Sequence, residues 1–195
     1  MSDVMTSAAS QQASEAPAPR HDLVIISASA SQTSRSEMVG DYLERLLTND
    51  YGSIAHIRVR ELPPAALARA DVDDGAIADA LSKLAQANAV VVITPTYKGS
   101  YSGLLKIFID LLPQYALRGK VVLPLATGGT IAHMQMMDHA LRPVLQTMWP
   151  RHIAQGCFLL DQHIERDESG GISLAENNVP LLFEVITAFE QMVAL

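Results

Sequence analysis

The segment NAVVVITPTYKGSYSGLLKIFIDLL, residues 88–112, determines the fold class that this chain is expected to adopt. Its apolar opening, Ala89 to Ile93, is rich in β-branched residues, which is typical of a strand buried on both faces of a parallel sheet. Beyond Gly103, apolar residues recur at helical spacing: Leu104, Leu105, Ile107, Phe108, Leu111 and Leu112. The segment therefore predicts a buried strand, a polar loop and a helix, in that order.

The polar loop from Thr94 to Gly103 is the first candidate binding segment. Ligands of open α/β sheets bind beyond the carboxyl ends of the strands. Pro95 restricts the backbone here, and Tyr97 and Tyr101 offer aromatic rings. The loop suits a flat aromatic ligand. An ordinary surface turn that carries two tyrosines is the alternative.

Strands and helices alternate along the rest of the chain. Further strands are expected at residues 23–26, 54–59, 120–126 and 156–160, and helices at 38–47, 71–87, 132–148 and 179–193. This alternation predicts a doubly wound α/β fold with a five-stranded parallel sheet in the order 2-1-3-4-5, which brings the loops after strands one, three and four to one rim. Pro124 predicts imperfect pairing within the fourth strand, and the polar residues 165–171 predict a mobile segment.

Composition limits the domain organisation and the classes of partner. Residues 1–20 are rich in Ala, Ser, Gln and Pro and predict a disordered extension, whereas residues 21–195 predict one domain. A net charge of −7 without a basic block argues against a nucleic-acid surface, and no apolar run is long enough to span a bilayer. Cys157, the only cysteine, lies in an apolar segment, which predicts a core residue in a reducing, cytoplasmic setting.

A hydroxyl-rich loop, SASASQTSRS at residues 27–36, leads into the first predicted helix. The N-terminus of a helix favours an anion, serine and threonine hydroxyls add donors, and Arg35 adds a positive charge. Phosphate binding is therefore expected in this loop. Capping of the helix by Thr33 or Ser34 alone is the alternative.

The loop after the fourth strand, Thr127-Gly128-Gly129-Thr130, has two glycines that allow a planar ligand to approach the backbone, although a plain turn has the same residues. The chain lacks G-x-G-x-x-G, G-x-x-x-x-G-K-[ST] and G-x-S-x-G, which argues against a Rossmann dinucleotide site, an ATP or GTP site and an α/β-hydrolase. His133 and His139 are wrongly spaced on their helix to share a metal, so no metal site is expected.

Three segments resemble the flavodoxin-like NAD(P)H-dependent FMN reductases, and within them the enzymes of two-component alkanesulfonate and methanesulfonate monooxygenase systems. They are TPTYKGSYSGLLKIFIDLLP at 94–113, GKVVLPLATGGTIAH at 119–133 and the shorter SASASQTSRS. The likeness runs from about Leu23 to Val144. The family usually has Gly-Ser-Pro-Arg where this chain has Ala-Ser-Ala-Ser at residues 28–31, so one arginine is missing from the first loop.

The resemblance implies where FMN would bind. Its phosphate is expected in the first loop and its ring system beside the second, with the third loop at the other edge. The residues expected to contact FMN are Ser29, Ser31, Ser34, Arg35, Ser36, Pro95, Thr96, Tyr97, Lys98, Ser102, Thr127, Gly128, Gly129 and Thr130. No side chain is expected to act as a covalent or acid–base catalyst, because the flavin supplies the chemistry.

The resemblance also implies an activity. It is hydride transfer from NADPH or NADH to FMN, and the FMNH₂ leaves for an alkane- or methanesulfonate-type monooxygenase in sulfonate sulfur metabolism. A homotetramer is implied, with apolar groups at Leu104, Met134, Met136 and Met137 left for neighbouring subunits. The alternatives are a quinone or azo reductase with tightly held FMN and a non-enzymatic flavodoxin-like electron carrier.

His139 occupies the place where members of the alkanesulfonate branch carry a tyrosine inserted into the helix as one extra residue. The resemblance implies that the insertion is present here as histidine, as in the methanesulfonate branch. The helix that holds His133 and His139 is therefore expected to contain a π-bulge at a subunit interface, which keeps FMN exchangeable. A histidine on a regular interface helix is the alternative.

Overall fold

The computed structural model describes residues 21–166, 172–174 and 179–195. The extension predicted for residues 1–20 lies outside the described residues. So does the part of the predicted mobile segment that follows Arg166. None of the helices within the described ranges combines the length and the hydropathy needed to cross a bilayer.

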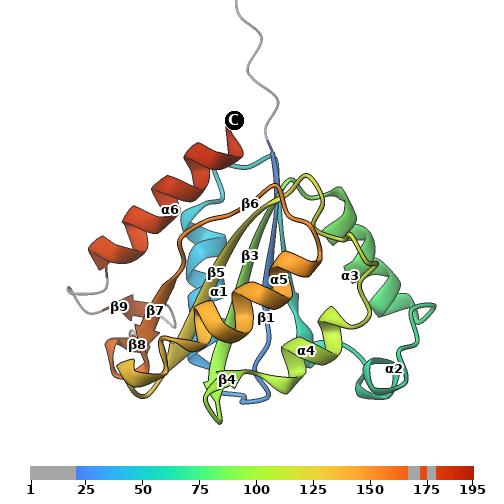
Figure 1. Ribbon diagram of the computed structural model, residues 1–195, viewed down its shortest axis with the longest axis horizontal. Helices are drawn as coiled ribbons and strands as arrows, with labels where there is room; N and C mark the ends of the chain where they lie inside the picture. The colour runs from blue at the N-terminus through green and yellow to red at the C-terminus, as the bar shows by residue number, and fades with distance from the viewer. Residues whose placement is uncertain (1–20, 167–171, 175–178) are drawn as a thin grey trace, which may run out of the picture.

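A parallel sheet forms the centre of the molecule (Figure 1). Four strands run side by side in the order β2-β1-β3-β5, and both β6 and β7 pair in parallel with the outer side of β5. The bounds are β1 Asp22–Ser27, β2 Ser53–Arg58, β3 Ala89–Tyr97, β5 Val121–Gly128, β6 His152–Ile153 and β7 Cys157–Leu160. The predicted order 2-1-3-4-5 is confirmed, and two short strands share its fifth position.

Pro124 interrupts the pairing at the edge of the sheet, as its position in the sequence predicts. Val122 pairs with Ile153 and Leu125 pairs with Cys157, so the outer strand has one residue more than β5 between these pairs. This extra residue is a bulge beside a proline that has no N–H to donate. Gly156 fills the bulge so closely that an added Cβ would lie 1.9 Å from the Pro124 carbonyl oxygen.

Helices cover both faces of the sheet (Figure 1). Strand residues alternate between the two sides, so that Ile25 and Val91 pack with α1 and α6, whereas Val24 and Val90 pack with α2 to α5. The bounds are α1 Arg35–Leu46, α2 Pro64–Arg69, α3 Gly75–Gln86, α4 Gly103–Ile109, α5 Arg142–Thr147 and α6 Val179–Val193, with 3-10 turns at Val59–Glu61, Ile131–His133 and Asp161–His163. Cys157 is 3% exposed, which confirms it as a core residue, and burial raises the pKa of its thiol to about 12.

Two segments that the sequence predicts as loops are short hairpins. β4, Ser100–Tyr101, pairs antiparallel with the end of β3. Lys98 and Gly99 form the turn with φ of 53° and 76°, the left-handed conformation that two-residue hairpins require. β8, Ile164–Arg166, pairs with β9, Ile172–Leu174, so the first two residues of the predicted mobile segment lie in a strand. Tyr101 packs against the core instead of offering its ring to a ligand.

The helix predicted for residues 132–148 is not a single α-helix. A π-helical turn spans Met137–Leu141, and the Arg142 N–H donates to the Met137 carbonyl five residues back, which confirms the expected irregularity. The sequence reasoning missed one local cause. Pro143 has no N–H, and its ring would collide with the His139 carbonyl in a regular α-helix.

Candidate functional site

The three predicted loops meet at the carboxyl edge of the sheet and enclose a cavity of about 140 Å³. It is lined by Ser29, Ser31, Thr33, Ser34, Arg35, Pro95, Thr96, Tyr97, Thr127, Gly128 and Asp161. All of these except Thr33 and Asp161 are site residues expected from the sequence. The strand order therefore brings most of the predicted site together. Thr127 and Gly128 reach it as the last residues of β5, not as part of a loop.

The first loop is shaped by its own hydroxyl groups. Ser34 caps α1, because its Oγ accepts a hydrogen bond from the Glu37 N–H at 3.1 Å. The Ser31 Oγ accepts from the Thr33 N–H at 3.3 Å. Ser36 is fully buried, and its hydroxyl hydrogen-bonds the Ser34 hydroxyl at 2.8 Å. Capping is thus correct for Ser34, yet the same residue also lines the cavity.

Two side chains of the β3 end face the first and third loops. The Tyr97 hydroxyl lies 3.1 Å from the Ser29 hydroxyl and joins two of the three loops. The Thr96 Oγ1 is buried, and it has no hydrogen-bond partner among the described residues. An unpaired buried hydroxyl costs about 1–3 kcal/mol, so this atom is suited to a partner that enters the cavity.

The other predicted site residues lie outside this cavity. Ser102 is 1% exposed; its hydroxyl caps α4 and donates to the Ala28 carbonyl at 2.6 Å. Lys98 stands in the exposed hairpin turn, and Gly129 and Thr130 are exposed beyond the end of β5. These residues, with Ser36, are near the rim without lining its enclosed part.

Asp161 is a rim residue that the sequence reasoning missed. It follows the end of β7, so the rule that picked out the other strand ends also applies to it. Burial raises the pKa of its carboxyl group, whereas the charge of Arg35 and a hydrogen bond from Thr127 act in the opposite direction. The cavity therefore holds one carboxyl group beside one guanidinium.

A cluster of charged side chains lies behind the first loop, between α1 and β2. Ligand atoms of Asp41, Glu44 and His56 lie within 4.8 Å of one another, which is close enough to hold a metal ion. Arg58 supplies the cation instead, with its Nη2 at 2.6 Å from Asp41 and 3.4 Å from Glu44. Burial, followed by the charge of Arg58, lowers the pKa of His56.

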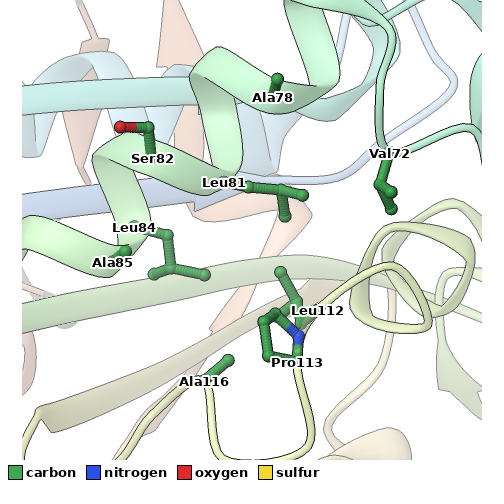
Figure 2. Close-up of a pocket in the computed structure, with 9 residues that line it drawn as sticks. All are labelled: Val72, Ala78, Leu81, Ser82, Leu84, Ala85, Leu112, Pro113 and Ala116. Atoms are coloured by element: carbon green, nitrogen blue, oxygen red, sulfur yellow. The ribbon is translucent and has the colours of Figure 1, made fainter.

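A larger cavity of about 440 Å³ lies away from the rim, between α3 and the turn after α4 (Figure 2). Figure 2 shows Leu81, Leu84 and Leu112 extending into this space. Its lining contains one hydroxyl group, that of Ser82, which accepts a hydrogen bond from Gln86. Because no charged side chain lines it, this cavity does not suit a phosphate.

The four apolar groups predicted for a subunit interface differ in burial, and Leu104 is half-buried against the core. Met136 and Met137 are 4% and 6% exposed and pack in the core, so the prediction that they are left uncovered is wrong. Met134 is 49% exposed beside Ile131 at 58%. His139 is exposed on the π-turn, outside the rim cavity, and lines an open hollow of about 800 Å³ with these two side chains.

Comparisons with known proteins identify the family of this chain. Residues 22–165 match the family described as NADPH-dependent FMN reductase. The chain is 39% identical to an FMN reductase (NADPH) from Escherichia coli K12 over 142 residues, which cover 73% of this chain and 74% of that one. It is 30% identical to the NADH-dependent FMN reductase SfnF from Pseudomonas putida over 177 residues, covering 85% of this chain and 95% of that one.

A solved structure gives the same answer at the level of the fold. The apo form of the NADH:FMN oxidoreductase EMOB superimposes with a TM-score of 0.80 at 36% identity, covering 88% of this chain and 89% of that chain. The sheet order observed here is the flavodoxin-like one. The chain therefore belongs to the NADPH-dependent FMN reductase family and is a flavodoxin-like oxidoreductase that uses FMN and a reduced nicotinamide.

Proposed function

We propose that this FMN reductase supplies FMNH₂ to a partner monooxygenase of the alkane- or methanesulfonate type. The observation that carries the proposal is the meeting of three strand-end loops around one polar cavity, in a chain that belongs to this family. Its relatives include both an NADPH-dependent and an NADH-dependent FMN reductase, so either nicotinamide is compatible with the proposal.

The cavity residues fit a flavin nucleotide in two respects. The buried Thr96 Oγ1 lacks a partner among the described residues, and a polar edge of the flavin ring would supply one. Gly128 stands where an added Cβ would lie 2.7 Å from Phe158 and 3.3 Å from the Thr96 Oγ1. Phe158 and Thr96 fill the space that a side chain would need, so Gly128 lines the cavity with backbone atoms alone, which a planar ring could contact.

The chain's own residues bind and orient the reactants. Ser29, Ser34, Arg35 and the start of α1 would hold the FMN phosphate, and Pro95 to Tyr97 with Thr127 and Gly128 would hold the ring. When bound, the flavin accepts a hydride from the nicotinamide and supplies the redox chemistry. No side chain is assigned a covalent or acid–base step.

Exchange of FMN is the second part of the proposal. His139, on the widened turn, would keep the ring end of the site loose, so that FMN enters and leaves as a substrate. The exposed Ile131 and Met134 beside it support an interface between subunits of a homotetramer. A cytoplasmic location belongs to the same proposal, since the single cysteine is buried as a free thiol.

The decisive experiment is to purify the protein and mix it with free FMN. We expect a colourless protein that oxidises NADPH or NADH only when FMN is added, and that supports turnover of a sulfonate monooxygenase with its sulfonate. Flavin that stays bound through gel filtration, with ping-pong kinetics towards a quinone or an azo dye, would assign the alternative reductase function. Failure to oxidise either nicotinamide with any flavin would refute both and leave the electron carrier.

A further inference from the structure

Arg60 reaches the first loop from the 3-10 turn that follows β2. Its Nη1 donates to the Ser31 carbonyl at 3.0 Å, and its Nη2 donates to the Glu37 carboxylate at 2.8 Å. Arg60 is therefore the link between the loop that lines the rim cavity and the first turn of α1. It lies outside the segments that match the family motifs, and nothing in its sequence context marks it as functional.

Glu37 occupies a position from which it would compete with a phosphate. Ser34 to Glu37 reads S-R-S-E, a capping box, in which the glutamate normally reaches back to the N–H of the capping residue. Half of this box is formed, since the Ser34 Oγ accepts from the Glu37 N–H. A carboxylate that completed the box would take the Ser34 N–H and place a negative charge at the helix N-terminus.

The structure has the carboxylate elsewhere. Glu37 contacts Arg60 at 2.8 Å and Arg58 at 3.9 Å, and its side chain is 13% exposed. Among the described residues, no hydrogen bond is found for the N–H groups of Ser34, Arg35 and Ser36. These are the first N–H groups of a 12-residue helix, directed to the edge where the cavity opens.

We propose that Arg60 is a positioning residue for FMN. It draws the Glu37 carboxylate away from the start of α1, neutralises it, and ties down the Ser31 carbonyl, so that the free N–H groups can bind the phosphate. The inference rests on the proposed placement of the FMN phosphate in the first loop. This role of Arg60 also accounts for Ser31 at the position where the family usually has arginine. The Arg60 guanidinium, which comes from the turn after β2, supplies the positive charge beside the loop.

A four-protein cycle tests the coupling: wild type, Arg60→Gln, Glu37→Gln and the double variant. Dissociation constants for FMN and riboflavin are measured by quenching of flavin fluorescence. We expect Arg60→Gln to weaken FMN roughly tenfold and riboflavin less than about twofold, because riboflavin has no phosphate. The double variant should regain most of the lost FMN affinity, since no free carboxylate then competes for the N–H groups.

Two further variants serve as controls for charge and position. Arg60→Lys retains the positive charge, so its affinity for FMN should stay near that of wild type. It also serves as the comparison if the glutamine variant folds poorly. Arg45→Gln removes the same charge near the other end of α1 and should leave the ratio of FMN to riboflavin affinity unchanged. An equal loss for both flavins in Arg60→Gln, or a double variant as weak as Arg60→Gln, would overturn the proposal.

The placement of the phosphate is tested separately by Arg35→Gln. If Arg35→Gln weakens the binding of FMN more than that of riboflavin, and Arg60→Gln does not, the role of Arg60 alone is refuted. If neither variant distinguishes the two flavins, the phosphate placement in the proposed function fails as well. A wild-type protein that reduces no flavin would refute the proposed function itself.

Discussion

Replacing Gly156 by alanine is expected to destabilise the protein severely. The added Cβ would lie 1.9 Å from the Pro124 carbonyl oxygen, 2.9 Å from the Pro124 Cγ and 2.6 Å from the Met137 Cε. The methionine can move, because the contact is with the end of a flexible side chain. The carbonyl cannot, because Pro124 lies in the middle of β5 and pairs with Val92 of β3 on its other side.

The size of the effect follows from this difference. Overpacking that side chains can relieve costs about 1–3 kcal/mol, and here the backbone would have to retreat by roughly 1 Å. We therefore expect a loss of about 3 kcal/mol or more, which lowers the melting temperature of a chain of this length by roughly 6–12 °C. Thermal unfolding followed by circular dichroism, with a urea titration, measures both quantities.

A matched substitution separates this clash from the general effect of alanine on the chain. Gly75 is the first residue of α3, and nothing lies within 4 Å of an added Cβ there. Gly75→Ala is expected to change the stability by less than about 1 kcal/mol, in the stabilising direction. A Gly156→Ala protein that melts within about 1 °C of wild type would refute the account of the bulge.

Three further predictions concern the rim, the charged cluster and the π-turn. Asp161→Asn should tighten FMN by a few fold and leave riboflavin unchanged in fluorescence titrations, because a carboxylate opposes a phosphate in the same cavity. His56 has a pKa below 6.5 in the fold, so the unfolded chain binds a proton there first and the free energy of unfolding falls as the pH drops below about 6.5. His56→Gln should flatten this fall in urea titrations between about pH 7.5 and 5.5, and an unchanged slope in this variant would refute the assignment to His56. If His139 alone is deleted, the Pro143 ring still prevents a regular helix. Deletion of His139 combined with Pro143→Ala should therefore give a yellow protein that retains FMN on gel filtration and turns over free FMN poorly. A colourless, fully active double variant would show that His139 has no part in FMN exchange.

The order of the sheet and most of the rim were predictable because they depend on local pattern and one topological rule. Ala89 to Ile93 is apolar throughout and rich in β-branched residues, which is typical of a strand covered on both faces. Once five strands alternate with helices, the residues after strands one, three and four must share an edge. Ser29, Tyr97 and Gly128 meet for this reason, although Ser29 and Tyr97 are 68 positions apart in the sequence and Tyr97 and Gly128 are 31 apart.

Other features depend on contacts that local pattern does not contain. Lys98-Gly99 is a weak turn signal, and the hairpin became visible only through the pairing of Tyr97 with Ser100. Met136 and Met137 are apolar residues on a predicted interface helix, but both are buried in the core at the start of the π-turn. Arg60 was missed because its partners, Ser31 and Glu37, lie in another segment and are matched by geometry alone.

The size of the rim cavity bears on whether FMN is a substrate or a fixed group. Pockets that bury most of a ligand of this size have volumes of about 300–1,000 Å³, whereas the enclosed space here is about 140 Å³. With FMN placed here as proposed, one protomer would enclose only part of the nucleotide. The first loop offers hydrogen-bond donors with a single guanidinium, that of Arg35, balanced by Asp161. A ligand held at one end by a nearly neutral site, with its ring left at an open edge, exchanges more readily than one enclosed on all sides. The geometry and charge of the rim thus support the proposal that FMN binds loosely, in addition to the widened turn at His139.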